Sequence, residues 1–152
     1  MEDRDHIFKI NYFPIFLCIL ILAVITFIIL VFLDDELNVN LEAVIFALIF
    51  CSLGSALLSF ILLNYYKITV NSTGVKGTNF WGKSKFVQWS NITSAKKFNL
   101  IGLKFVRLFP RDGSLPLWIP LFLNKMSEFK DLTIKLSPEG NVAKNFLSSH
   151  NV

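Results

Sequence analysis

The stretch FPIFLCILILAVITFIILVFL, from Phe13 to Leu33, decides the fold class because it runs for 21 residues without a charged side chain. At a rise of about 1.5 Å per residue, a helix of this length measures about 30 Å, the thickness of a bilayer's hydrocarbon core. A second stretch of this kind, AVIFALIFCSLGSALLSFILL, runs from Ala43 to Leu63 in a chain that is 53% hydrophobic. The sequence therefore predicts two transmembrane helices, residues 13–33 and 43–63.

Two other interpretations of these stretches fit the sequence less well. A cleaved signal peptide has an apolar run of about 7 to 15 residues and an A-x-A-like cleavage site, whereas the first stretch ends in Leu33-Asp34-Asp35. A buried helical hairpin of a soluble protein would need far more chain to cover it than the fewer than 90 residues that follow Leu63.

The basic residues predict the orientation of the two helices. Arg4 and Lys9 precede the first stretch, a series of lysines from Lys67 onward follows the second, and residues 34–42 contain no Lys or Arg. By the positive-inside rule we expect residues 1–12 and residues 64–152 in the cytoplasm. Residues 34–42 then form a periplasmic or extracellular loop.

The predicted cytoplasmic domain is strongly basic. Residues 64–152 contain 13 Lys or Arg and four acidic residues, a net charge of +9. Beneath a bilayer each basic residue near the surface contributes up to roughly 1 kcal/mol of attraction to anionic headgroups. A membrane anchor makes nucleic acid an unsuitable partner. The candidate surface for lipid or a protein partner comprises Lys67, Lys76, Phe80, Trp81, Lys83 and Lys85, where Phe80 and Trp81 either dip into the lipid interface or pack onto the domain.

Small residues form a stripe on the second apolar helix. Ala47, Cys51, Ser55 and Ser59 recur every four residues, an arrangement that lets another helix approach closely. The neighbour is either the first helix of the same chain or a helix of a second copy or partner protein. Cys18 and Cys51 both lie inside the apolar stretches and have no metal-binding spacing, so they are interpreted as packing residues.

After Tyr66 the pattern becomes that of a mainly-β domain. Short runs with period-two alternation, separated by turn residues, predict about six strands in a meander, at residues 66–71, 75–80, 84–89, 93–99, 102–110 and 114–123. From Asn124 the apolar period is that of a helix, with Asn124 as its cap and Ser137-Pro138 as its end. A shorter helix is expected at residues 141–149.

The segment GTNFWGKS, from Gly77 to Ser84, matches the nucleotide-binding pattern G-x-x-x-x-G-K-[ST]. Such a loop needs a helix directly behind its Lys, so that the helix N-terminus faces the phosphates. The following SKFVQW has strand composition instead. We therefore interpret Gly77 as a bulge and Gly82 as a hairpin turn.

Two N-terminal apolar helices followed by YKITVNSTGVKG, FVQWSNI and LWIPLFLNKMSEFKDLTIKL resemble the bacterial pleckstrin-homology-like (PH-like) membrane proteins. The resemblance rests on the order of elements and on a few anchor residues: Gly74, Trp89, Ile92, Pro120 and Phe122. It implies a partly open antiparallel barrel whose end is capped by the C-terminal amphipathic helix through Phe129, Leu132 and Leu136. It also implies a binding scaffold without catalysis.

The residue types needed for catalysis are sparse. The histidines, His6 and His150, fall in chain ends expected to be frayed, and no His, Cys, Asp and Glu residues share a metal-ligand spacing. We expect no enzyme activity, cofactor or metal. The function expected is a membrane-anchored binding or scaffolding protein; the alternative is a membrane-resident immunity protein that neutralises a membrane-acting toxin.

Overall fold

The computed structural model describes residues 4–33, 41–78 and 82–149, and the chain forms two compact units. The helical unit comprises Tyr12–Leu62, and the second unit comprises Met1–Asn11 together with Leu63–Val152. The second unit is built on an antiparallel sheet, and we call it the sheet unit. The chain thus leaves the sheet unit after Asn11, forms the helices and returns.

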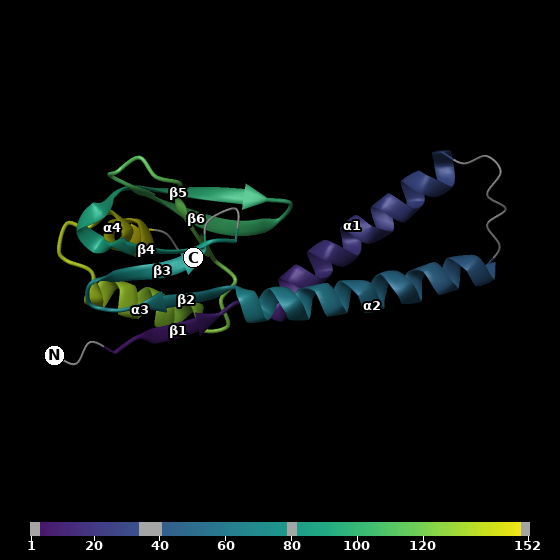
Figure 1. Ribbon diagram of the computed structural model, residues 1–152, viewed down its shortest axis with the longest axis horizontal. Coiled ribbons are helices and arrows are strands. Elements are labelled where there is room, and N and C mark those ends of the chain that lie inside the picture. The colour runs from purple at the N-terminus through teal and green to yellow at the C-terminus, as the bar shows by residue number, and fades with distance from the viewer. Residues whose placement is uncertain (1–3, 34–40, 79–81, 150–152) are drawn as a thin grey trace. The chain divides into compact units, whose positions relative to one another are not determined.

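The helical unit contains α1 (Tyr12–Leu33) and most of α2 (Leu41–Tyr65) (Figure 1). Both helices are long and apolar enough to cross a membrane, as predicted, and only 6% of the apolar window of α1 and 11% of that of α2 is buried. Large apolar side chains such as Phe32 and Phe46 are 81% and 72% exposed. Since water solvates such surfaces poorly, the helices are suited to lipid.

The sheet unit contains seven strands in its described part (Figure 1). They are β1 (His6–Lys9), β2 (Lys67–Val70), β3 (Gly74–Thr78), β4 (Ser84–Gln88), β5 (Ile92–Leu100), β6 (Leu103–Pro110) and β7 (Leu117–Pro120). The antiparallel order is β1-β2-β3-β7-β6-β5, and β4 also pairs with β3. β4 pairs along all of β3, so β2 and β7 share the opposite edge of β3.

The predicted meander is confirmed within two groups of three strands, but the prediction did not include the pairing that joins the two groups. β2, β3 and β4 pair in sequence, and so do β5, β6 and β7. The two halves are joined by the pairing of Thr78 in β3 with Trp118 in β7, a long-range contact without a local signal. A short 3-10 helix, Trp89–Asn91, forms the corner between the halves.

The N-terminal segment differs from the expectation of a frayed end. His6 begins β1, which pairs antiparallel with β2 through His6↔Val70, Ile7↔Thr69, Phe8↔Ile68 and Lys9↔Lys67. Phe8 is buried and its ring lies edge-on to that of Phe129, with centroids 5.3 Å apart. The strand β1, before α1, thus belongs to the same sheet as the strands after α2.

The two glycines of the GTNFWGKS segment have different roles. Gly82 has a φ of +72°, which suits the predicted turn. Gly77 is not in a bulge, because it pairs regularly with Lys85; a Cβ there would lie 2.7 Å from Ile68 Cδ1, so glycine makes room for core packing. The strand β4, not a helix, follows Lys83, which excludes the geometry of a nucleotide-binding loop.

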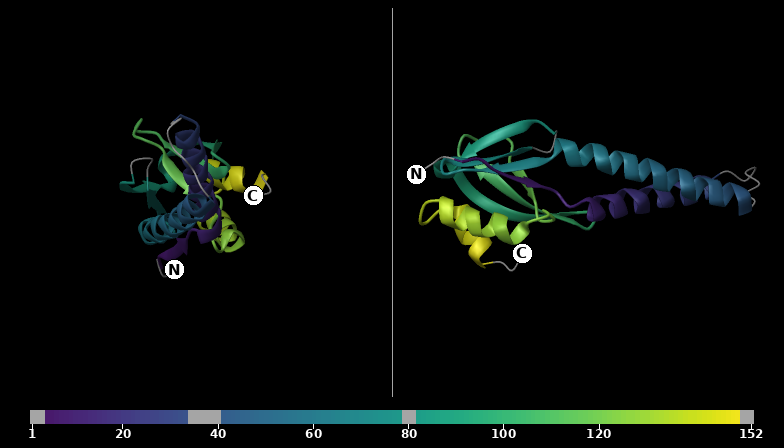
Figure 2. Two further views of the ribbon diagram at one scale, coloured as in Figure 1. Left: turned by 90° about the vertical axis from the view of Figure 1, so that its right-hand side faces the viewer. Right: turned by 90° about the horizontal axis from the view of Figure 1, so that it is seen from below.

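Two helices, α3 (Met126–Leu136) and α4 (Val142–Ser149), lie together on one side of the strands (Figure 2). The predicted end at Ser137 is confirmed, but Lys125 rather than Asn124 holds the cap position of α3, without a side-chain hydrogen bond. Phe129 is buried, whereas Leu132 and Leu136 are half-buried. Buried residues of the sheet that share this core include Val106, Leu108, Leu117 and Ile119.

Candidate functional site

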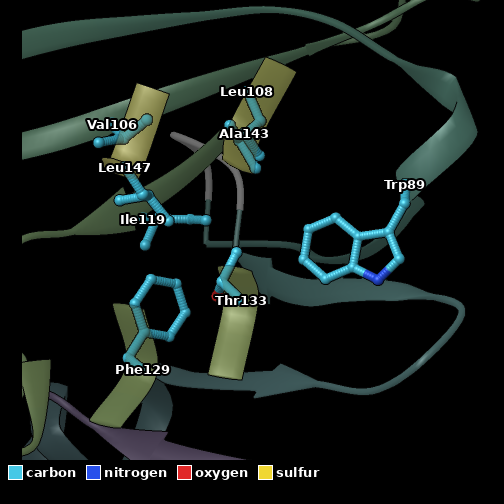
Figure 3. Close-up of a pocket in the computed structure, with 8 residues that line it drawn as sticks. All are labelled: Trp89, Val106, Leu108, Ile119, Phe129, Thr133, Ala143 and Leu147. Atoms are coloured by element: carbon cyan, nitrogen blue, oxygen red, sulfur yellow. The ribbon is translucent and has the colours of Figure 1, made fainter. Parts of the chain in front are cut away.

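A small cavity lies inside the sheet unit between the sheet and the helices α3 and α4 (Figure 3). Its lining is apolar except for the Thr133 hydroxyl, whose oxygen is buried and has no hydrogen-bond partner. The indole N–H of Trp89, also in the lining, already donates to the Asn71 carbonyl at 3.0 Å. The volume of about 10 Å³ is that of a single water, which needs two or more polar partners. This cavity is therefore a packing gap and not a ligand site.

A cationic surface forms on the outer side of β1 to β4. Phe8, Ile68, Val75 and Val87 point into the core, so the residues that alternate with them point outward. The strand register aligns Lys9 with Lys67, Ile7 with Thr69, Thr69 with Lys76, and Lys76 with Phe86. We call this surface the basic face; its members are Ile7, Lys9, Lys67, Thr69, Lys76 and Phe86.

The basic face combines unpaired cations with protruding apolar groups. Lys9 and Lys67 lie directly opposite each other across two strands, an arrangement of like charges that destabilises a sheet. An ion pair between Lys125 and Glu128, at 3.0 Å, lies outside this face. Ile7 and Phe86 are 61% and 44% exposed. The face therefore exposes positive charge together with apolar side chains.

The structure brings together only part of the surface predicted from the sequence. Lys67 and Lys76 lie on the basic face, and Lys9, which the sequence reasoning missed, joins them. Lys83 is exposed in the turn before β4. Phe80 and Trp81 lie outside the described residues. The missed strand, HIFK, is too short for its alternation to stand out beside a long apolar helix.

Lys85 is held in a loop contact away from the basic face. Its ammonium donates to the Leu115 carbonyl at 2.9 Å and to the Ser114 hydroxyl. The hydroxyl and backbone N–H of Ser114 both donate to the Asp112 carboxylate. These bonds, together with the charge of Lys85, lower the pKa of Asp112 below its usual value. This group of residues clamps the loop between β6 and β7 onto β4.

The small-residue stripe on α2 coincides with the least exposed side of that helix. Ser55 and Ser59 are buried, with 2% and 0% exposure, and Ala47 and Cys51 are half-buried. The Ser59 hydroxyl donates to the Ser55 carbonyl at 2.7 Å, which satisfies it within the helix. The stripe is thus a packing surface, and self-association through it stays a prediction.

Among residues 4–33, 41–78 and 82–149, no three His, Cys, Asp or Glu side chains lie close enough together to hold a metal ion. The chain matches no protein-family model, and no curated protein or solved structure matches it.

Proposed function

We propose that this protein is a non-enzymatic binding or scaffolding module anchored in the inner membrane of a bacterium. In this proposal α1 and α2 span the membrane, both chain ends are cytoplasmic, and the sheet unit is a PH-like, partly open barrel capped by α3. The basic face binds anionic lipid headgroups. The observation that carries the proposal is the clustering of Lys9, Lys67 and Lys76 on one side of the sheet.

The pairing of β1 with β2 supports a membrane hairpin. β1 ends at Lys9, just before α1, and β2 begins at Lys67, just after α2. Two strands of one sheet must lie on the same side of a membrane, so the segment between them crosses it an even number of times. Removal of α1 as a signal peptide would also take away β1, and with it the buried Phe8 side chain.

The distribution of charge supports a cytoplasmic sheet unit. Its described residues include Arg4, Lys9 and the 13 basic residues after α2, whereas residues 34–42 carry four acids and no Lys or Arg. Basic segments next to a span are retained on the cytoplasmic side. There they face the anionic leaflet, to which each lysine near the surface adds about 1 kcal/mol of attraction.

The arrangement of strands and helices supports the PH-like assignment. Two antiparallel halves, β2 to β4 and β5 to β7, are followed by α3, and Phe129 of α3 is almost fully buried against the sheet unit. The corner between the halves is fixed by Trp89, whose carbonyl accepts a hydrogen bond from the Asn141 side chain at 2.6 Å. In such a barrel the helix closes the core and leaves the outer strand faces free to bind.

The basic face can be tested in the full-length protein reconstituted in nanodiscs. A spin label at Thr69→Cys, in a variant whose Cys18 and Cys51 are replaced by Ala, reports contact with water or lipid through water-soluble and lipid-soluble relaxation agents. We expect phosphatidylserine, compared with phosphatidylcholine alone, to lower the accessibility of the label to the water-soluble agent. High salt should reverse this, because it screens the lysines.

Matched variants separate a defined face from overall charge. Replacing Lys9, Lys67 and Lys76 by Gln should abolish the effect of phosphatidylserine. Replacing three exposed lysines elsewhere in the sheet unit, Lys97, Lys104 and Lys135, should leave it intact. Equal loss in both triple variants would mean that lipid attraction is diffuse, and no response to phosphatidylserine in the parent protein would refute lipid binding by this face.

A further inference from the structure

The outer side of β5, β6 and β7 carries a cluster of aromatic rings. Val106, Leu108, Leu117 and Ile119 are buried on the inner side, so Phe105, Arg107, Phe109 and Trp118 lie on the opposite side. The register places Phe98 beside Phe105 and Trp118 beside Arg107. We call this surface the aromatic face; its members are Phe98, Phe105, Arg107, Phe109, Trp118 and Phe122, each of them half-buried.

The rings form one connected, edge-to-face cluster. Trp118 lies 5.1 Å from Phe98 and 5.5 Å from Phe105, measured between ring centroids, and Phe105 lies 5.4 Å from Phe122. Such contacts hold the side chains in fixed positions before any partner arrives. Binding on a surface of this kind loses little side-chain entropy, which favours affinity.

Arg107 lies in the middle of this cluster and is surrounded by rings. Its guanidinium carbon lies 4.4 Å from the Phe98 centroid and 5.6 Å from the centroids of Phe109 and Trp118. Its Nε atom is buried without a hydrogen-bond partner, and no carboxylate pairs with Arg107 within the described ranges. Lys96, opposite Arg107 in the register, lies over Phe109 at 5.7 Å. The cluster therefore holds positive charge that is not neutralised by an acid.

This composition is unusual for the outer side of an antiparallel sheet, which is normally polar where it faces water. Trp, Phe and Arg are the residue types that supply the centre of protein–protein interfaces. The surrounding charge is also one-sided. Between Ile92 and Phe122 the chain has five Lys or Arg and one acid, Asp112. The carboxylate of Asp112 already accepts a hydrogen bond from the backbone N–H of Ser114. A complementary surface would be acidic and would carry an apolar anchor.

We propose that the aromatic face docks an acidic segment of a partner protein. An aliphatic or aromatic side chain of that segment packs on the rings, and its carboxylates pair with Arg107 and Lys96. A protein fits better than a bilayer because these rings are half-buried against one another, whereas Ile7 and Phe86 of the basic face protrude. The two faces lie on different strands, so this proposal stands whether or not the basic face binds lipid.

The test uses the full-length protein in nanodiscs of neutral phosphatidylcholine and synthetic fluorescent peptides. One peptide alternates Glu with Leu and Phe, a second has Lys in place of every Glu, and a third has Ser in place of every Leu and Phe. Fluorescence anisotropy should show binding of the first peptide only. Arg107→Gln should weaken this binding by about tenfold or more, as expected for loss of a charge-assisted contact. Arg107→Lys should retain part of it.

The matched control is Lys135→Gln, which removes one positive charge from an exposed position of α3, outside both faces, and should leave the affinity unchanged. Thermal unfolding of each variant shows whether Arg107→Gln still folds; if it does not, Lys96→Gln, at an exposed position, replaces it as the test. The proposal is overturned if acidic and basic peptides bind alike, if Lys135→Gln weakens binding as much as Arg107→Gln, or if no acidic peptide binds. Loss of phosphatidylserine binding in Arg107→Gln, with peptide affinity unchanged, would assign the face to lipid instead.

Discussion

Replacing Phe8 by Ala tests whether the residues before α1 belong to the sheet. Phe8 is 3% exposed, pairs with Ile68 across β1 and β2, and meets Phe129 edge-on at 5.3 Å. Truncating a buried Phe to Ala removes its transfer free energy and leaves a cavity, a cost of about 3–5 kcal/mol. In a unit of about a hundred residues, each kcal/mol lowers the midpoint of thermal unfolding by about 4–8 °C.

The neighbouring Ile7 supplies the control, because it lies on the same strand but is 61% exposed. Ile7→Ala should change the free energy of unfolding by less than about 0.5 kcal/mol, as surface substitutions do. The assay is thermal unfolding of the full chain in detergent micelles, followed by near-ultraviolet circular dichroism, to which buried Trp89 contributes. If both variants unfold at the parent temperature, β1 is not part of the folded sheet, and the argument for an even number of spans fails with it.

Three further predictions concern the sheet unit. Gly74→Ala would place a Cβ 2.3 Å from the backbone oxygen of Val87, which cannot move without breaking the pairing of β3 with β4, so we expect urea unfolding to show a loss of about 3 kcal/mol or more. Gly77→Ala meets only side-chain atoms, of Ile68 and Leu117, and should cost less. Thr133→Val removes a buried hydroxyl without a partner and should raise the free energy of unfolding by about 1 kcal/mol, whereas Thr133→Ser, which keeps the hydroxyl, should lower it. Because the pKa of Asp112 is lowered in the folded protein, its carboxylate stabilises the fold above the usual pKa of 3.8, and this stabilisation is lost as the pH falls through the folded-state pKa. Asp112→Asn removes this titration. The midpoint of thermal unfolding should therefore fall less steeply in the variant than in the parent protein below about pH 4.

The features that the sequence predicted well are those with a local physical cause. Inside a membrane, long charge-free runs can satisfy their backbone groups only as helices. α1 begins one residue before its predicted start and ends at Leu33 as predicted, and α2 extends two residues beyond its predicted limits at each end. Period-two alternation fixes which side of a strand is buried, so residue types alone predict β2 to β7. The helical period of the apolar residues after Asn124 predicts α3 in the same way.

The features that the sequence did not predict depend on contacts between distant segments. The strand β1 is four residues long, and nothing in its composition shows that it pairs with residues about 60 positions later. Gly77 looks like a bulge in sequence because a glycine weakens a strand; its actual role, making room for Ile68, needs the packing of another strand. The aromatic face was missed because Phe98, Phe105 and Trp118 come from three strands, and each alone resembles an ordinary strand residue.

The position of β1 links membrane insertion to the formation of the basic face. If α1 and α2 span the membrane as proposed, Lys9 before α1 can meet Lys67 and Lys76 after α2 when both helices have crossed or when neither has, but not when only one has. A chain with one helix inserted would leave β1 and β2 on opposite sides of the membrane, with the place of Phe8 beside Phe129 empty. Since the loss of that packing costs a large part of the stability of a small domain, the cationic surface would not form in a chain with a single inserted helix. The same pairing that closes the sheet would thus exclude half-inserted chains from lipid binding.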